Sequence, residues 1–259
     1  MNPVKITPSR IEDFEACPLR FDLLHVRHAS PGSRRPSPQL SLGISVHECL
    51  YRFHEGGGHK VFGPEVMTRL LERSWIGEGY ADDAEQSSYR EEAIRVCEQY
   101  YAMFRDEPTQ NIGNELFLQG RFRVDGVEVL LSGKLDRLSL WPDGRLEVID
   151  YKMGNSAPPS PTKLAASLGT LLYYALARVN YAQYDRVEVA FLYLRTMTKV
   201  VATYDEDLLA ECKARLKWIV NQISSGLFPA KPNGYCGWCE VRSSCPAMRK
   251  EWTDIDSVA

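Results

Sequence analysis

The stretch "RLEVIDYKMG", residues 145–154, has the alternation of a β-strand but places an acid and a lysine where apolar side chains are expected. Side chains alternate between the two faces of a strand, so Leu146, Val148, Asp150 and Lys152 share one face. That face is apolar at its start and ionic at its end. A strand that runs out into solvent would show the same feature. The meaning of the triplet therefore depends on its neighbours.

The composition is that of a globular chain. It has 259 residues, 44% of them hydrophobic, and a formal net charge of -3 at pH 7, which allows a substantial buried core. No apolar run reaches membrane-spanning length, and residues 1–18 lack the basic flank and apolar segment of a secretion signal. We therefore expect a cytoplasmic protein without membrane contact. Nucleic-acid contact would have to come from local basic patches.

The order of periodic segments predicts a chain that mixes helices and strands. Residues 88–107 are amphipathic at helical spacing, and residues 48–110 together form a predicted helical subregion. From residue 115 the period becomes that of strands, with three in succession and the turn "WPDGR" between the last two. A helix is predicted over residues 162–179, followed by two paired strands and a last helix.

A second acidic residue interrupts the strand before the opening stretch. Asp136 falls within the otherwise apolar alternation of "LLSGKLDRL". Because a short hairpin brings such positions within side-chain reach, we infer that Asp136 approaches Asp150. Two carboxylates in a partly dry pocket repel each other unless a cation lies between them, and oxygen ligands favour Mg2+ or Mn2+. With Lys152 to stabilise developing charge or orient a water, this combination predicts phosphodiester hydrolysis.

Three of the seven cysteines lie close together near the end of the chain, as Cys236, Cys239 and Cys245. In an intracellular protein, such clustering within residues 230–250 favours a metal over disulfides. Tetrahedral metal centres commonly need four ligands, so one more is required. Zinc and iron–sulfur both suit cysteine ligands, and free thiols are the least expected of the three alternatives.

The stretches "GKLDR" and "VIDYK" together resemble the core of the PD-(D/E)xK nuclease superfamily. The resemblance implies a restriction-endonuclease-like α/β fold, with a central mixed β-sheet flanked by helices, as a single domain over residues 1–259. The chain is most similar to the RecB-type exonuclease branch, which includes iron–sulfur nucleases of the AddB type and of CRISPR spacer acquisition. "TPSRIEDFEACPLRF" matches the opening of that branch, and "GISVH" matches its G-x-x-x-H element.

The resemblance also implies a function and a set of catalytic residues. It predicts a metal-dependent DNA nuclease, an exonuclease acting on single-stranded DNA or DNA ends in repair or recombination. His47 would bind the metal with Asp136 and Asp150, the backbone carbonyl of Tyr151 would complete the shell, and Lys152 would be the catalytic lysine.

Accessory residues and partners follow from the same resemblance. Glu115 matches an early acidic residue, with an ordinary surface acid as the alternative. Tyr174 matches the tyrosine of a Q-x-x-x-Y helix motif in which Thr170 replaces the glutamine. That replacement keeps open a DNA-binding or helicase-partner subunit that cuts little. A spacer-processing nuclease acting with an integrase is the other alternative.

The cysteine site is completed by resemblance as well. In the iron–sulfur members, one cysteine near the start and three at the end hold a [4Fe-4S] cluster. Cys17 is the matching residue here, so the cluster would join the two ends of the chain, and zinc is the rival metal.

Overall fold

The computed structural model describes residues 3–29 and 36–248. The outermost residues of the predicted domain 1–259, and residues 249–250 of the predicted cysteine segment, lie outside the described residues. The centre is a six-stranded mixed sheet with the order β1-β3-β4-β5-β6, and β2 pairs with β3. The strands are β1 (Val4–Ile6), β2 (Gln110–Val124), β3 (Val127–Leu140), β4 (Leu146–Lys152), β5 (Val187–Tyr193) and β6 (Thr198–Val201).

The three predicted successive strands form an antiparallel meander of β2, β3 and β4. The turn between β3 and β4 closes with a hydrogen bond from the Trp141 amide to the Arg145 carbonyl, and Gly144 supplies the positive φ of 81° that the turn requires. β5 and β6 form the predicted strand pair and run antiparallel, and β4 pairs parallel with β5. The short strand β1 has no counterpart among the predicted elements, and it pairs parallel with β3.

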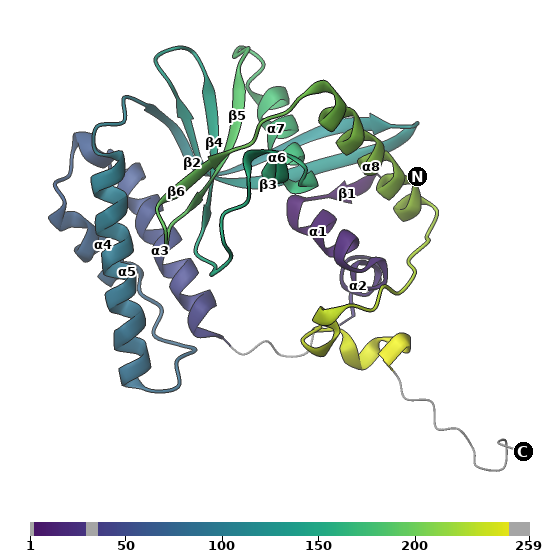
Figure 1. Ribbon diagram of the computed structural model, residues 1–259, viewed down its shortest axis with the longest axis horizontal. Helices are drawn as coiled ribbons and strands as arrows, with labels where there is room; N and C mark the ends of the chain where they lie inside the picture. Colours follow the sequence, from purple (N-terminus) through teal and green to yellow (C-terminus); the bar gives the residue numbers. More distant parts are fainter. Residues whose placement is uncertain (1–2, 30–35, 249–259) are drawn as a thin grey trace, which may run out of the picture.

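Helices lie on both faces of the sheet (Figure 1). Three of them, α3, α4 and α5, form a layer at one side of the sheet, corresponding to the predicted helical subregion. This layer begins at Pro38, earlier than predicted, because Ser37 caps the helix and Pro38 takes its first position. The helices are α1 (Pro8–Ala16), α2 (Pro18–Phe21), α3 (Pro38–Glu55), α4 (Glu65–Ser74), α5 (Asp83–Phe104), α6 (Pro161–Ala165), α7 (Leu168–Asn180) and α8 (Glu206–Ser224).

The helix predicted over residues 162–179 is interrupted between α6 and α7. The break leaves backbone carbonyls without helical partners, and α8 satisfies one of them. Arg215 donates to the carbonyl of Ala166 at 2.7 Å, and the Cys212 thiol lies 3.8 Å from the carbonyls of Ala165 and Ala166. A tertiary contact therefore stabilises the interruption, and the local sequence pattern does not predict that contact.

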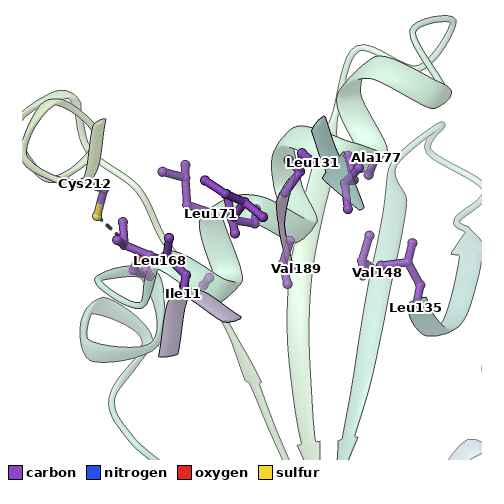
Figure 2. Close-up of a cluster of buried hydrophobic side chains, with 14 of the residues drawn as sticks. Ile11, Leu131, Leu135, Val148, Leu168, Leu171, Ala177, Val189 and Cys212 are labelled. Atoms are coloured by element: carbon purple, nitrogen blue, oxygen red, sulfur yellow. Dashed lines mark hydrogen bonds between the residues drawn. The ribbon is translucent and has the colours of Figure 1, made fainter. Parts of the chain in front are cut away.

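Two clusters of buried side chains hold the sheet between its helices. The larger joins α1, α7 and α8 to β3, β4 and β5. Figure 2 shows part of it, in which Leu168, Leu171 and Ala177 of α7 belong to the same cluster as Leu131 and Leu135 of β3 and Val148 of β4. The second joins α3, α4 and α5 to the other side of β4 and β5. No helix within the described residues is long and apolar enough to cross a membrane.

A fork in the sheet positions the candidate site. β1 and β4 both pair with the edge of β3 that faces away from β2, but at different places. β1 pairs with residues 129–131 of β3, and β4 pairs with residues 137–140. Residues 132–136 of β3 therefore lie between the two partners, and Asp136 is at the point where β4 departs.

Candidate functional site

Where β4 separates from β3, a side chain of β3 accepts a hydrogen bond from the backbone of β4. The last regular pair is Arg137 with Ile149. Beyond it, the Tyr151 amide donates to the Asp136 carboxylate, with 2.6 Å between N and Oδ2. An extended residue directs its N–H and C=O toward the same edge, so the carbonyl of Tyr151 faces Asp136 as well. The structure thus brings Asp136 and the backbone of Tyr151 together.

Three candidate metal ligands converge at this fork from different elements. His47 comes from α3, Glu115 from β2 and Asp136 from β3. One ligand atom from each lies within 4.8 Å of the others, and Nδ1 of His47 is 3.5 Å from Oδ1 of Asp136. They line a hollow of about 470 Å3 that opens to solvent. Carboxylate oxygens with few other protein donors suit Mg2+ or Mn2+, so the residues fit such an ion.

Glu115 reaches this cluster through an uncommon backbone conformation. Its φ is 52°, in the left-handed region that non-glycine residues rarely adopt. The side chains on either side take opposite directions, because Asn114 bonds to Glu55 of α3 while Leu116 packs against the α7 cluster. The alternation of β2 is therefore inverted at Glu115. Backbone strain of this kind is often found at functional sites.

The charges around His47 favour its protonated form when no metal is bound. Burial alone would lower the pKa of His47, but the hydrogen bond and charge of Asp136 outweigh it, and the pKa is raised. Asp150 and Glu115 add to this effect.

Asp150 and Lys152 form an ion pair beside the fork. Nζ of Lys152 lies 2.7 Å from Oδ2 of Asp150. Burial raises the pKa of Asp150, and the charge of Asp136 adds to this, whereas Lys152 opposes it. For Lys152, burial alone would lower the pKa, but Asp150 raises it overall. Lys152 therefore stays protonated, and its ammonium group also lies 4.7 Å from the centre of the Phe191 ring.

Two residues that sequence reasoning missed contribute to this pair. Burial raises the pKa of Tyr173 on α7, and the nearby carboxylate of Asp150 adds to this rise. The adjacent Tyr174, which is the tyrosine that the resemblance predicts, contacts Tyr204 instead, with 5.9 Å between the ring centres. Burial raises the pKa of Glu12 on α1, the charge of Lys152 opposes this rise, and the charge of Asp150 adds to it.

Tyr173 and Tyr174 each stand four residues after a small residue of α7, at the spacing of the Q-x-x-x-Y motif. Four residues before Tyr173 stands Gly169, whereas Thr170 is fully buried one residue further on. A Cβ atom at Gly169 would lie 3.1 Å from Oε1 of Glu12. The Glu12 carboxyl therefore occupies space that a side chain at position 169 would need. The local sequence of α1 does not indicate that Glu12 would lie against Gly169 of α7.

A buried hydroxyl anchors the opposite face of the fork. The Tyr100 hydroxyl of α5 lies 2.6 Å from Nε2 of His54 and 2.8 Å from the Tyr151 hydroxyl. It also accepts a hydrogen bond from Nη1 of Arg137 at 3.0 Å. Arg137 and Tyr151 directly follow Asp136 and Asp150 in the chain, so this network fixes the backbone on which both carboxylates are carried.

The four predicted cysteine ligands lie around one hollow. Cys17 stands between α1 and α2, and Cys236, Cys239 and Cys245 follow in the C-terminal segment. Backbone amides donate to two of the sulfur atoms: the amide of residue 231 to Cys17 at 3.4 Å, and that of residue 233 to Cys236 at 3.3 Å. Figure 1 shows this segment beside α2. The structure thus brings the four predicted cysteines to the lining of the same hollow.

Comparisons with known proteins agree with this geometry. A family model described as the PD-(D/E)XK nuclease superfamily matches residues 5–246. The chain belongs to this superfamily. Its members are metal-dependent nucleases, and the predicted mixed sheet flanked by helices is confirmed.

Other comparisons are less informative. No curated protein matches the chain. Among solved structures, the crystal structure of SSO0001 is similar with a TM-score of 0.40 and 13% identity, covering 93% of this chain and 98% of that chain. A likeness at this level supports no inference about the function of the site in this superfamily member.

Replacing Tyr100 with phenylalanine tests the anchor. Removing the hydroxyl leaves buried groups of His54, Tyr151 and Arg137 without a partner, so we expect the free energy of unfolding to fall by about 1–3 kcal/mol. Urea denaturation measures it. Tyr89→Phe is the matched control, because its hydroxyl accepts a bond from a surface glutamine. Equal stability of the Tyr100 variant and the wild type would show that the network does not hold the fork.

Proposed function

We propose that this chain is a divalent-metal-dependent deoxyribonuclease of the RecB-type branch, an exonuclease that hydrolyses phosphodiester bonds in single-stranded DNA or at DNA ends. Its role would be in DNA repair or recombination. The observation that carries the proposal is the convergence of His47, Glu115 and Asp136 at the fork, beside the ion pair of Asp150 and Lys152. A metal-binding carboxylate group and a protonated lysine are the elements that phosphate hydrolysis requires.

Each of these residues has a distinct role in the proposal. His47, Asp136 and Asp150 would hold Mg2+ or Mn2+, with Glu115 and the carbonyl of Tyr151 as further ligands. A bound divalent ion would supply stabilisation of negative charge on the phosphate.

Lys152 acts on the attacking water in this proposal. Asp150 holds its ammonium group at 2.7 Å, and the Phe191 ring lies on another side. The ammonium hydrogens that remain would orient the water by hydrogen bonding. Tyr173 lies near Asp150 and would position it by hydrogen bonding.

We further propose that Cys17, Cys236, Cys239 and Cys245 hold a [4Fe-4S] cluster. Backbone amides donate to the sulfur atoms of Cys17 and Cys236, and amide hydrogen bonds to sulfur are usual in iron–sulfur sites.

The proposed cluster would join segments that already contact each other. Nη2 of Arg20 lies 2.7 Å from Oε1 of Glu240, and the side-chain amide of Asn233 donates to the carbonyl of Ala16. The cluster would fix these contacts between the N-terminal helices and the tail. Its role would be structural, on the scale of a disulfide that closes a long loop.

Cleavage of end-labelled DNA by anaerobically purified protein tests the proposed activity. We expect single strands to be degraded with Mg2+ or Mn2+ and not with chelator. Lys152→Met and Asp136→Asn should each lower the rate by about 100-fold or more. Lys213→Met, an exposed lysine on α8, should cut as the wild type does.

The same assay separates the nuclease from the alternative functions. A folded wild-type protein that binds DNA but cuts no substrate with either metal would contradict the enzyme and favour a DNA-binding subunit. Action with a helicase or an integrase stays a prediction from the resemblance, which a co-purifying partner would test.

Replacing each of the two adjacent tyrosines with phenylalanine tests which of them acts on Asp150. Tyr173→Phe should lower the cleavage rate about tenfold or more, because Asp150 loses a hydrogen-bond donor. Tyr174→Phe should have no such effect, because its ring contacts Tyr204 outside the ligand cluster. Single-turnover rates measure both. A larger loss in the Tyr174 variant would reverse the assignment.

Substitution of a cysteine identifies the metal. The wild type should contain iron and acid-labile sulfide in equal amounts, whereas a zinc site would contain zinc alone. Cys239→Ser should abolish the iron–sulfur absorption and lower the thermal midpoint. Cys97→Ser, which changes a buried cysteine of α5, should keep the absorption. Zinc without iron in anaerobic protein would contradict the cluster.

A further inference from the structure

One face of the β2–β3 ribbon is exposed next to the metal site. Before the fork, Leu131 and Leu135 of β3 pack under α7, while Lys134 between them is exposed. On β2, Leu118 is buried while the side chains at 117, 119, 121 and 123 are exposed. The exposed side chains of both strands share the face opposite α7.

The strand register arranges these side chains in rows that lead away from the ligands. Phe117 stands opposite Lys134, and Arg121 stands opposite Leu130. Lys5 of β1 stands beside Leu130 on its other edge. Cross-strand neighbours lie on one face, so the rows are continuous. From residue 136 to residue 130 the strip is roughly 20 Å long, and a hollow of about 400 Å3 lies at its far end.

The strip carries mostly positive charge. Its cations are Lys5, Arg121, Arg123 and Lys134, and Glu128 is 3.6 Å from Arg123. Lys134 pairs with Glu115 of the ligand cluster. Within the part of the chain that the structure describes, Lys5 and Arg121 have no ion-pair partner. A local excess of cations in a chain of net charge -3 favours a polyanion as the occupant.

An exposed aromatic ring distinguishes between single and double strands. Phe117 is 67% exposed, and it stands beside Lys134 in the row nearest the metal site. A flat apolar ring next to a cation suits a nucleotide whose base stacks on the ring while its phosphate meets the ammonium group. In a duplex the bases stack on one another and are not available to the ring.

We propose that this strip, made by Phe117, Lys134, Arg121, Arg123 and Lys5, holds a single strand of DNA where it enters or leaves the metal site. The proposal rests on the proposed nuclease function, because it extends the path of that substrate beyond the fork. Its occupant is an extended single strand, held by phosphate contacts along the strip and by one stacked base at Phe117.

Binding without cleavage tests the strip. The full chain, in chelator, is titrated with labelled single-stranded DNA of about 12 nucleotides and of about 3 nucleotides. Phe117→Ala should weaken binding of the longer strand by about fivefold or more. Arg121→Ala should reduce the slope of log affinity against log salt by about 0.7, the value for one phosphate contact in a single strand. The loss of affinity in the Phe117 variant and the reduction of the salt slope in the Arg121 variant should both be larger for the longer strand.

Matched variants and a duplex complete the experiment. Val61→Ala and Arg95→Ala change exposed residues of the α3–α5 layer, and they should bind the single strand as the wild type does. A loss in the Phe117 variant that is equal for duplex and single strand would overturn the proposal, as would unchanged affinity and salt slope in both strip variants.

The outcomes also separate the strip from the nuclease function. A wild type that cleaves DNA while both strip variants bind all lengths normally overturns the strip alone. A wild type that cuts nothing, with strip variants that lose the single strand, supports the strip and contradicts the nuclease function. Circular dichroism confirms that each variant is folded.

Discussion

The hydrogen bond from the Tyr151 amide to the Asp136 carboxylate is the contact on which the site depends. It stands where the β3–β4 ladder ends, and it replaces the backbone bond that a continued ladder would make. Because a carboxylate takes that position, β4 separates from β3 while its amide remains satisfied. The separation leaves Asp136 free on its other oxygen, which faces His47 at 3.5 Å. The fork and the ligand cluster are therefore one structural feature.

Buried polar contacts on the opposite face keep the fork in register. Nη2 of Arg137 lies 3.0 Å from Oε2 of Glu107, and Lys199 lies 2.7 Å from Glu147, which is fully buried. Burying such charges costs free energy that their attraction only partly offsets, so they contribute little net stability. Their geometric demands are strict, however, and they allow one alignment of β3 with β4. We infer that these charges serve register more than stability, since a shift by one residue would bury Asp136.

The sequence predicted the parts of the structure that local pattern determines. The β4 strand, its hairpin and the two acids follow from alternation and turn chemistry. The start of α3 was missed because its proline-rich beginning has the composition of a loop. The side of α7 that faces Asp150 could not be predicted either, because adjacent tyrosines differ by about 100° around a helix and only tertiary packing decides between them. Glu12 was missed because only tertiary packing brings α1 to Gly169.

The carboxylates at the fork each have a cation of the chain as a partner. Glu115 pairs with Lys134, Asp150 with Lys152, and Asp136 with His47. These pairs limit the repulsion that converging acids would otherwise create in the folded protein.

A divalent ion at the proposed site would compete with these same cations. The pair of Glu115 and Lys134 is partly exposed and contributes about 0–1 kcal/mol, so its disruption costs little. Lys134 would then be free to turn toward a phosphate, while Lys152 stays beside Asp150. His47 would have to give up its proton to become a ligand. The pairs that limit repulsion between the carboxylates thus also place positive charge where the substrate would bind.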